Sequence, residues 1–216
     1  MGERVGRFIT VEGPDGAGKS TLARAIAEQI EAAGESVVLT REPGDSPIGA
    51  AVRALLLDGD DLDRWTEAFL FLADRREHCL HVIRPALLAG KWVVCDRFAD
   101  STVAYQGYGA GLDVSELRSM NELATAGLRP DATILLDLDP QVALQRLSDK
   151  NRLDRMPLDY HERVREGFLT ESRLDPDRWI VLDASRPPEE VRADALRLLA
   201  ERFAFPVILS PGGDPA

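Results

Sequence analysis

Eight consecutive residues near the start of the chain have the types and spacing of a phosphate-binding loop. They are Gly13, Pro14, Asp15, Gly16, Ala17, Gly18, Lys19 and Ser20, which match the pattern G-x-x-x-x-G-K-[ST]. Glycines allow backbone N–H groups to converge on an anion, and a helix that starts there adds a partial positive charge. Lys19 would reach the β- and γ-phosphates, and the Ser20 hydroxyl would ligate Mg²⁺. The loop predicts that the protein binds a nucleoside triphosphate.

The segments on either side of this loop are those that a phosphate-binding loop requires. Residues 7–12 are a short apolar run typical of a buried strand, and residues 21–30 carry apolar side chains at helical spacing. An ordinary glycine-rich turn is the alternative interpretation, and the two matching flanks disfavour it. Lys19 is one of only three lysines in the chain, which further disfavours a chance match to the phosphate-binding pattern.

Strand and helix patterns alternate along the chain. Strands are predicted at residues 7–12, 36–40, 92–95, 132–136 and 179–182. Helices are predicted at residues 21–30, 47–57, 64 to about 88, 114–126, 140–147, 158–171 and 188–202. Alternation of this kind implies βαβ crossovers, and therefore a three-layer α/β fold with a five-stranded parallel sheet and helices on both faces. We expect a single domain over residues 1–204 and a mobile tail over residues 205–216.

The net charge and the lack of long apolar runs limit which partners the protein is expected to bind and where in the cell it is expected to lie. A net charge of −11 over 216 residues argues against a broad basic surface, so neither nucleic acid nor an anionic membrane is an expected partner. No apolar run approaches the ~18 residues that span a bilayer, and residues 1–7 lack the apolar core of a signal peptide. These features predict a cytoplasmic protein.

Two cysteines and two of the histidines are given structural rather than metal-binding interpretations. Cys79 and Cys95 lack metal-ligand spacing, and buried free thiols fit a reducing compartment. His78 and His81 are expected to be surface or capping groups, because no carboxylate or thiol stands at ligand spacing. No zinc site is predicted.

Charged side chains follow two of the predicted strands. Ligands in parallel sheets bind outside the carboxyl ends of the strands, so these positions are the ones to inspect. Asp96, at the end of one strand, is placed to hold a magnesium shell, and Arg97 follows it. A capping Asp with a surface Arg is the alternative. Residues 40–44 place a cation before a Pro-Gly turn, and Arg53 lies on the next helix, where a solvated or paired Arg is the simpler interpretation.

Two further segments have side chains suited to a planar base. Phe71 and Arg75 are four residues apart on a predicted helix and so share one face, although core packing alone would also explain Phe71. Residues 101–109 combine hydroxyls, an amide and two phenols, which suits direct reading of a small ligand.

A charged segment late in the chain interrupts the helical pattern. Its cations Lys150, Arg152 and Arg155 lie within about residues 148–157. Beside a triphosphate site these cations indicate a lid that closes over the transferring phosphate, and an exposed charged loop is the alternative.

Taken together, these residues resemble thymidylate kinases, the nucleoside monophosphate kinases of the P-loop class that act on dTMP. The resemblance extends over about residues 7–202 and rests on several motifs in the right order. They are residues 8–13, the phosphate-binding loop, residues 40–44, residues 71–78, residues 96–107 and residues 151–154. The resemblance implies a P-loop kinase fold and the reaction ATP + dTMP → ADP + dTDP, in dTTP synthesis, with transfer in line.

The resemblance also implies how dTMP is held. Phe71 stacks on thymine, Arg75 contacts the base edge, and Thr102 and Gln106 lie where the family reads the base. Tyr105 stands where a phenol crowds the sugar 2′ position and disfavours ribonucleotides. The acceptor phosphate and the rest of the pocket involve Arg53, Arg97, Glu42, Pro43 and Ser101.

The donor side is implied in the same way. Lys19 and the loop amides hold ATP, Mg²⁺ is bound through Ser20 and Asp96, and Asp15 orients the acceptor sugar and a metal-bound water. Further residues of the implied ATP site are Thr21, Arg146, Asp183 and Ala184. The family also implies a homodimer.

Two arrangements of a catalytic arginine occur in the resembled family. One has an Arg inside the loop, where this chain has Gly16, and the other takes cations from the lid, which matches Arg152 and Arg155. The chain therefore resembles the bacterial type. It departs from the family pattern at residues 43–45, where Asp45 adds a carboxylate. It also departs at Met156 and Pro157, because the family commonly has acidic residues at these two positions.

Two alternatives stay open beside this interpretation. The chain could be a kinase of another nucleotide or of a nucleoside, although a nucleoside would leave Arg53 and Arg97 without a phosphate to bind. It could also be a non-enzymatic P-loop switch, which would order its loops around the γ-phosphate and lack an acceptor pocket.

Overall fold

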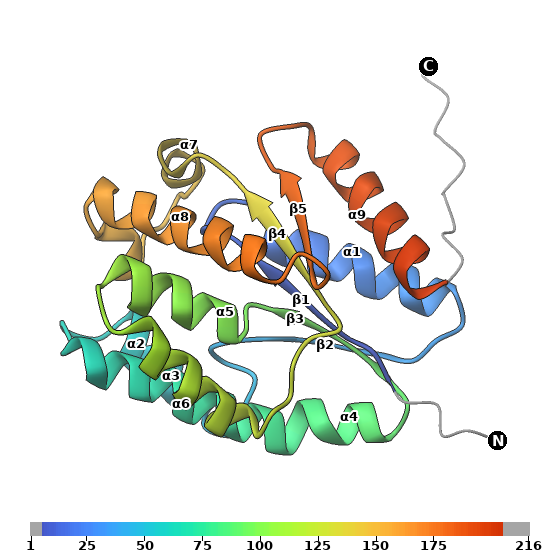
Figure 1. The fold of residues 1–216 in the computed structure, drawn as a ribbon, viewed down its shortest axis with the longest axis horizontal. Helices are drawn as coiled ribbons and strands as arrows, with labels where there is room; N and C mark the ends of the chain where they lie inside the picture. The colour runs from blue at the N-terminus through green and yellow to red at the C-terminus, as the bar shows by residue number, and fades with distance from the viewer. Residues whose placement is uncertain (1–5, 205–216) are drawn as a thin grey trace.

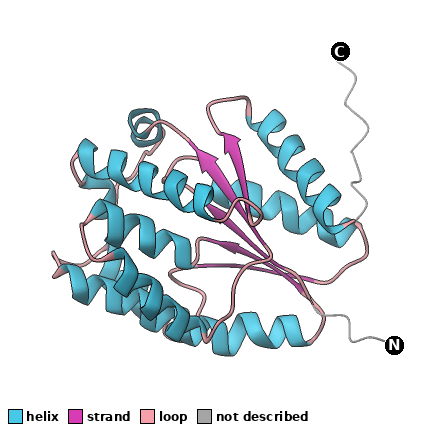
Figure 2. Ribbon diagram, in the orientation of Figure 1, coloured by secondary structure: helices cyan, strands magenta, loops and turns pink. Residues whose placement is uncertain are grey.

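Five parallel strands form the centre of the molecule in the computed structural model, which describes residues 6–204 (Figures 1 and 2). The strands are β1 (Phe8–Glu12), β2 (Val37–Arg41), β3 (Trp92–Asp96), β4 (Ala132–Asp137) and β5 (Trp179–Asp183). Their order in the sheet is β2-β3-β1-β4-β5, and each neighbouring pair is parallel. The predicted α/β fold is confirmed, and each strand lies within one residue of its predicted bounds.

Helices cover both faces of this sheet, as Figure 1 shows. The helices are α1 (Lys19–Ala32), α2 (Gly49–Leu57), α3 (Arg64–His78), α4 (Arg84–Leu88), α5 (Ala99–Thr102), α6 (Val114–Thr125), α7 (Pro140–Gln145), α8 (Leu158–Leu174) and α9 (Pro188–Phe203). Helices α1 and α9 pack on one face of the sheet, whereas α4 and α8 pack on the other. The result is the three-layer arrangement expected for a sheet that is buried on both sides.

Alternation along each strand divides the apolar core between the two faces. Ile9 and Val11 of β1 join the core beneath α1 and α9, whereas their neighbour Phe8 joins a second cluster with Cys79 and Ile83. A third cluster lies between β4 and α8. Because successive side chains of a strand point to opposite faces, one short apolar run supplies both cores.

The helix predicted from residue 64 to about 88 is continuous, but its middle part is a π-helix rather than an α-helix. A wider π-helical stretch, η1 (Cys79–Ile83), separates α3 from α4. Pro85 lies just beyond it, and a proline inside a helix has no N–H to donate and collides with the carbonyl four residues earlier. A locally wider winding accommodates this residue, which the apolar pattern alone did not reveal.

A second wide-wound segment was not predicted at all. Helix α5 continues into η2 (Val103–Gly109), which packs against α8 and α6. Its sequence combines polar and aromatic residues, most of which are buried. It therefore lacks the alternation of apolar and exposed polar positions by which an amphipathic helix is predicted. Such π-helical turns are frequent at functional sites.

Other expectations concern the ends of the chain, the thiols and the membrane. The predicted mobile tail, residues 205–216, falls outside the described residues. Cys79 and Cys95 are buried free thiols, as predicted. None of the helices in residues 6–204 combines the length and the apolar character needed to cross a bilayer.

Candidate functional site

The phosphate-binding loop connects β1 to α1 at the carboxyl edge of the sheet. Gly13 has φ +136°, and a Cβ atom there would lie 2.5 Å from the carbonyl oxygen of Leu136. Gly16 has φ +82°, and its Cβ would lie 2.4 Å from the carbonyl oxygen of Ala143. No side chain fits at either position, so an arginine in place of Gly16 is sterically excluded.

A compact charge cluster lies beside this loop. The Arg97 guanidinium donates to Asp15 Oδ1 at 2.7 Å, and Lys19 Nζ lies 3.3 Å from the same oxygen. Burial alone would raise the pKa of Asp15, but the charges of Arg97 and Lys19 outweigh it and hold that pKa below its ordinary range. Burial, with repulsion from Arg97, lowers the pKa of Lys19. The cluster therefore holds two cations and one carboxylate where phosphate would bind.

Arg97 is held in an unusual backbone conformation. Its φ is +70°, which residues other than glycine seldom adopt, and such strain concentrates at functional sites. Its guanidinium also donates to Ser101 Oγ at 3.1 Å and to the Tyr105 hydroxyl at 3.1 Å. Ser101 in turn donates to Glu12 Oε2 at 2.6 Å, and burial together with the charge of Asp100 raises the pKa of Glu12 to about 7.

A cavity with about 520 Å³ of empty space opens on the Arg97 side of the loop. Pockets that hold small ligands are concave and combine apolar and aromatic side chains with a few polar groups. Its lining residues are Asp15, Glu42, Pro43, Arg53, Leu57, Phe71, Arg97, Ser101, Thr102, Tyr105, Gln106, Asn151 and Leu153. The structure thus brings together nine residues of the implied dTMP pocket, from β2 to η2, and we call this space the acceptor cavity.

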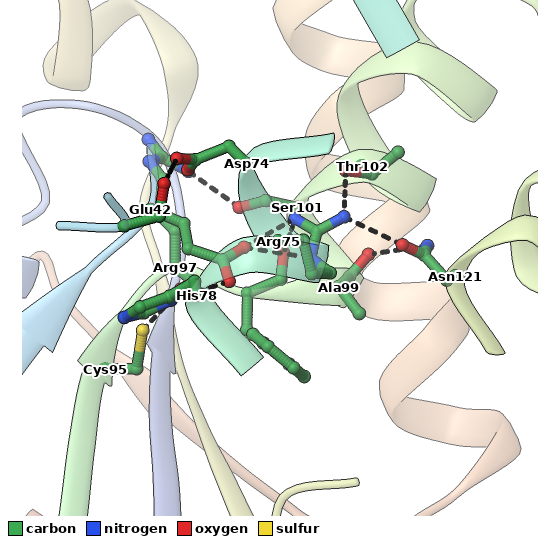
Figure 3. Close-up of polar contacts among 12 residues, drawn as sticks. Glu42, Asp74, Arg75, His78, Cys95, Arg97, Ala99, Ser101, Thr102 and Asn121 are labelled. Carbon is green, nitrogen blue, oxygen red and sulfur yellow. Dashed lines mark hydrogen bonds and ion pairs between the residues drawn. The ribbon is translucent and has the colours of Figure 1, made fainter. Parts of the chain in front are cut away.

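Arg75 is not one of the residues that line this cavity, and Figure 3 shows its polar contacts with residues that do, such as Glu42 and Thr102. Its guanidinium donates to Glu42 Oε2 at 2.9 Å, to Thr102 Oγ1 at 2.9 Å and to Asn121 Oδ1 at 2.7 Å. It is 1% exposed, so it acts on the cavity through the side chains that it holds. The role of Arg75 at the base edge stays a prediction.

The prediction that His78 is a surface or capping group is wrong. His78 is fully buried, and its Nδ1 lies 2.9 Å from Glu42 Oε1 (Figure 3). Its Nε2 lies 2.7 Å from Thr40 Oγ1. The helical pattern around it could not show that β2 and the turn after it supply two polar partners. His81 is exposed, as expected. Among the described residues, no cluster of His, Cys, Asp and Glu side chains could hold a metal ion by itself.

The wall of the acceptor cavity near β2 is built by Arg53 and the turn after the strand. Arg53 donates to the carbonyl oxygen of Pro43 at 2.8 Å and lines the cavity, so it is neither simply solvated nor paired with a carboxylate. Asp45, the unexpected carboxylate, is exposed and lies 3.4 Å from Arg41. It does not line the cavity.

Ser20 and Asp96 meet at the end of β3. The Ser20 hydroxyl donates to Asp96 Oδ2, whereas Asp96 Oδ1 is buried and has no hydrogen-bond partner in the part of the chain that the structure describes. A hydroxyl and a carboxylate, one oxygen of which lacks a partner, suit Mg²⁺, which binds through few protein oxygens together with phosphate oxygens and water. The donor set therefore fits the predicted metal.

A second cavity opens on the other side of the loop. It is lined by Gly16, Ala17, Gly18, Thr21, Leu22, Leu136, Arg146, Ala184, Pro188, Glu189, Val191 and Arg192. Arg146 and Ala184 are brought together as the resemblance implies, and Arg146 Nη1 lies 3.4 Å from the carbonyl oxygen of Ala184. Asp183 lies outside the lining and accepts from Ser185. We call this space the donor cavity.

The predicted lid contains the short 3₁₀ turn η3 (Leu153–Arg155) and places its two arginines differently. Arg152 donates to Glu67 and to the carbonyl oxygen of Leu56 at 3.1 Å, so it ties the lid to α2 and α3. Arg155 is exposed, and its side chain makes no hydrogen bond or ion pair within the described part of the chain. Asp154 is buried close to the loop, where burial and the charge of Asp15 raise its pKa to about 6.

Several residues of this region were not predicted. Glu12 and Glu67 are buried carboxylates that contact predicted site residues, and Pro188, Glu189 and Arg192 of α9 line the donor cavity. Glu12 and the start of α9 could have been found, because both lie at the carboxyl end of a strand. Nothing local in the sequence marks Glu67.

Comparisons with known proteins agree on one family. A family model described as thymidylate kinase matches residues 11–195. A thymidylate kinase of Desulfovibrio desulfuricans is 50% identical over 196 residues, covering 85% of this chain and 90% of that protein. One from Deinococcus radiodurans is 44% identical, covering 91% and 98%. The crystal structure of thymidylate kinase from Ehrlichia chaffeensis aligns with a TM-score of 0.75 at 37% identity, covering 90% of this chain and 99% of that one.

Proposed function

The chain belongs to the thymidylate kinase family and phosphorylates dTMP with ATP in the synthesis of dTTP, and we propose that its two cavities hold the two substrates. The donor cavity takes ATP and the acceptor cavity takes dTMP. One observation carries this assignment, namely that consecutive loop residues line different cavities. Asp15 lines the acceptor cavity, whereas Gly16, Ala17 and Gly18 line the donor cavity. The loop therefore lies between the two cavities, with one substrate proposed on each side of it.

The acceptor cavity is proposed to bind dTMP through both its 5′-phosphate and its base. Arg53 and Arg97 line this cavity and are the cations available for the 5′-phosphate. Phe71 offers a ring to the base, and Tyr105 stands beside Arg97 where the sugar would lie. Thr102 Oγ1 accepts from Arg75, which leaves the hydroxyl hydrogen of Thr102 for the ligand. A nucleoside acceptor would leave both arginines without a phosphate, so a monophosphate is favoured.

Catalysis in this arrangement is proposed to consist of positioning and charge neutralisation along an in-line path. A phosphate oxygen of dTMP is already anionic, so no strong general base is needed. Lys19 and the loop amides hold the donor phosphates, and Arg97 holds the acceptor against their repulsion. Asp15 fixes Arg97 at 2.7 Å and orients the acceptor sugar.

Mg²⁺ is proposed to bind at Ser20 and Asp96. When bound, the ion neutralises charge on the β- and γ-phosphate oxygens. The support is the buried Asp96 Oδ1, which has no hydrogen-bond partner among residues 6–204. Asp96→Asn should therefore raise the Mg²⁺ concentration needed for half-maximal activity, and an unchanged requirement would remove Asp96 from the metal site.

The lid is proposed to act through Arg155, with Arg152 as its anchor. Arg155 is exposed and without a side-chain partner among residues 6–204, so closure of the lid could carry it to the transferring phosphoryl group. The Arg152 side chain is occupied by Glu67 and by the carbonyl oxygen of Leu56, near the C-terminal end of α2. Closure would also exclude the water that otherwise hydrolyses ATP.

A second copy of this chain is proposed as the partner, joined along a groove between α3 and α6. Phe69 is 54% exposed and Leu123 is 79% exposed, and both line this groove. Large apolar side chains exposed side by side favour burial against another protein. Leu123→Glu should convert a dimer to a monomer in sedimentation equilibrium, and an unaltered mass would move the interface elsewhere.

Nucleic acid and membranes are proposed to play no part. The support is the net charge of −11, which repels polyanions and anionic lipid surfaces. A cytoplasmic location is proposed from the two buried free thiols.

The proposal is tested by ADP release with ATP, Mg²⁺ and each acceptor in turn. Release should depend strongly on dTMP, be weaker with dUMP and be absent with thymidine. Slow release that is indifferent to every acceptor would instead indicate a nucleotide-binding switch and overturn the assignment of the acceptor cavity.

A further inference from the structure

The carboxylate of Glu67, on α3, is shared between two parts of the site. Its Oε1 accepts from Gln106 Nε2 at 2.7 Å, and its Oε2 accepts from Arg152. Glu67 itself is 5% exposed and does not line the acceptor cavity, whereas Gln106 does. Glu67 therefore cannot touch a ligand in the cavity, but it holds a side chain that can.

This contact fixes which end of the Gln106 amide faces Glu67. A carboxylate paired with a guanidinium has no hydrogen to donate, so the group it contacts must be the amide NH₂. The opposite end of the amide, Oε1, is then left for the cavity that Gln106 lines. In the described part of the chain, the hydrogen bonds of this side chain run through Nε2 alone. With a neutral neighbour that both donates and accepts, either amide orientation would be satisfied.

An acceptor oxygen at this position matches one class of base. Thymine and uracil carry a donor N–H at N3, whereas cytosine presents a bare N3 acceptor there. A carbonyl oxygen opposite an acceptor is left unpaired and repelled, and sites built to hydrogen-bond one edge reject its mismatch strongly. Resting on the proposed role of Gln106 in reading the base, we propose that Glu67 is a positioning residue that sets the preference for thymine over cytosine.

Arg152 supplies the countercharge that this arrangement needs. A buried carboxylate is costly unless it is paired and hydrogen-bonded, and Arg152 pairs with Glu67 while it also donates to the carbonyl oxygen of Leu56. The lid thus stabilises the ionised form of the residue that orients Gln106. Base selection and lid docking share one carboxylate.

The test is the ratio of kcat/KM for dTMP to kcat/KM for dCMP in Glu67→Gln. This variant keeps the size of the side chain but lets the Gln106 amide adopt either orientation, so the ratio should fall by about tenfold or more. The matched control is Arg152→Lys, which retains a cation beside Glu67. It should keep the wild-type ratio within about threefold, whatever its effect on kcat. An unchanged ratio in Glu67→Gln, or an equal fall in both variants, would overturn the proposal.

Gln106→Met separates failure of this inference from failure of the proposed site. It removes the amide and keeps an unbranched side chain of similar length, so the ratio should fall at least as far as in Glu67→Gln. If Gln106→Met leaves the ratio unchanged, Gln106 does not read the base, and both the assignment and the inference fall. If Gln106→Met lowers the ratio and Glu67→Gln does not, the assignment stands and the inference alone is overturned.

A measurement on the wild-type protein covers the case in which Glu67→Gln does not fold. In a crystal structure with dTMP, the Gln106 side chain should keep one end on Glu67 Oε1 and place the other on N3 of thymine. A Gln106 that leaves Glu67 to reach the base, or one that stays on Glu67 without contacting the base, would contradict the proposal.

Discussion

The donor and acceptor sides of the loop are built by different means. The donor side uses backbone geometry: glycines at positions that exclude a Cβ, loop amides and a single lysine, all within eight residues. The acceptor side uses side chains from α2, α3, α5, η2 and the segments that follow β2 and β3. They are joined by contacts such as Arg75 to Glu42 and Arg97 to Asp15. A site made of backbone can be carried by a short motif, whereas a site made of side chains requires the whole fold.

The largest expected effect breaks the donor side. Lys19→Ala should lower kcat by about 10³-fold or more, because the donor phosphates lose the one buried cation of the loop. The control is Lys91→Ala, an exposed lysine before β3. Steady-state kinetics with saturating ATP and dTMP give the measurement, and a near-normal kcat would remove Lys19 from its role.

The next effect separates the two sides. Arg97→Ala should raise the KM for dTMP by about 10–100-fold, the value of one or two charge-assisted hydrogen bonds, and leave ATP binding nearly intact. Arg197→Ala, at an exposed position on α9, is the control. Equal losses for both substrates would mean that Arg97 serves the loop as a whole rather than the acceptor.

A smaller effect tests the lid that spans both sides. Arg155→Ala should lower kcat by about tenfold and change each KM by less than about threefold, because the lid cation acts on charge that develops during transfer. Arg152→Ala should instead weaken docking of the lid on α2 and α3. A wild-type kcat in Arg155→Ala combined with a large loss of kcat in Arg152→Ala would reverse the two roles.

The smallest expected effect is on the free energy of unfolding, and it tests the protonation of Glu12, which contacts Ser101 on the acceptor side. Burial, with the charge of Asp100, raises the pKa of Glu12 from an ordinary 4.5 to about 7. Between these values the folded protein retains a proton that the unfolded chain has lost, so this group makes the free energy of unfolding fall as pH rises. Glu12→Gln lacks the ionisable group and should gain stability relative to wild type across this window.

Urea unfolding at pH 5 and pH 7.5 measures this difference. Glu28→Gln, on the exposed side of α1, is the control for loss of one carboxyl group. A difference between Glu12→Gln and wild type that is the same at both pH values would show that Glu12 keeps an ordinary pKa in the folded protein.

The comparison also explains what the sequence could predict. Residues 13–20 and the five strands were evident, because phosphate-binding loops and buried strands are marked by neighbouring residues. Phe71, Arg53 and Gln106 gained their roles only from the family resemblance, since a helical pattern does not distinguish a cavity wall from a core.

The residues that escaped prediction depend on contacts distant in the sequence. His78 is buried because β2 offers Thr40 and the turn after β2 offers Glu42. Glu67 matters because Gln106 and Arg152 converge on it. Residues 103–109 form a wide-wound helix because α6 and α8 enclose them, although their composition resembles a loop. In each case the deciding partner lies on another element, so no local pattern could indicate it.

The central claim is that phosphoryl passes directly between two cavities separated by the loop. The most direct test uses ATP whose γ-phosphorus is made chiral with oxygen isotopes, followed by determination of configuration in dTDP. One in-line transfer predicts inversion at phosphorus. Retention would require two successive transfers through a covalent enzyme intermediate and would contradict the account.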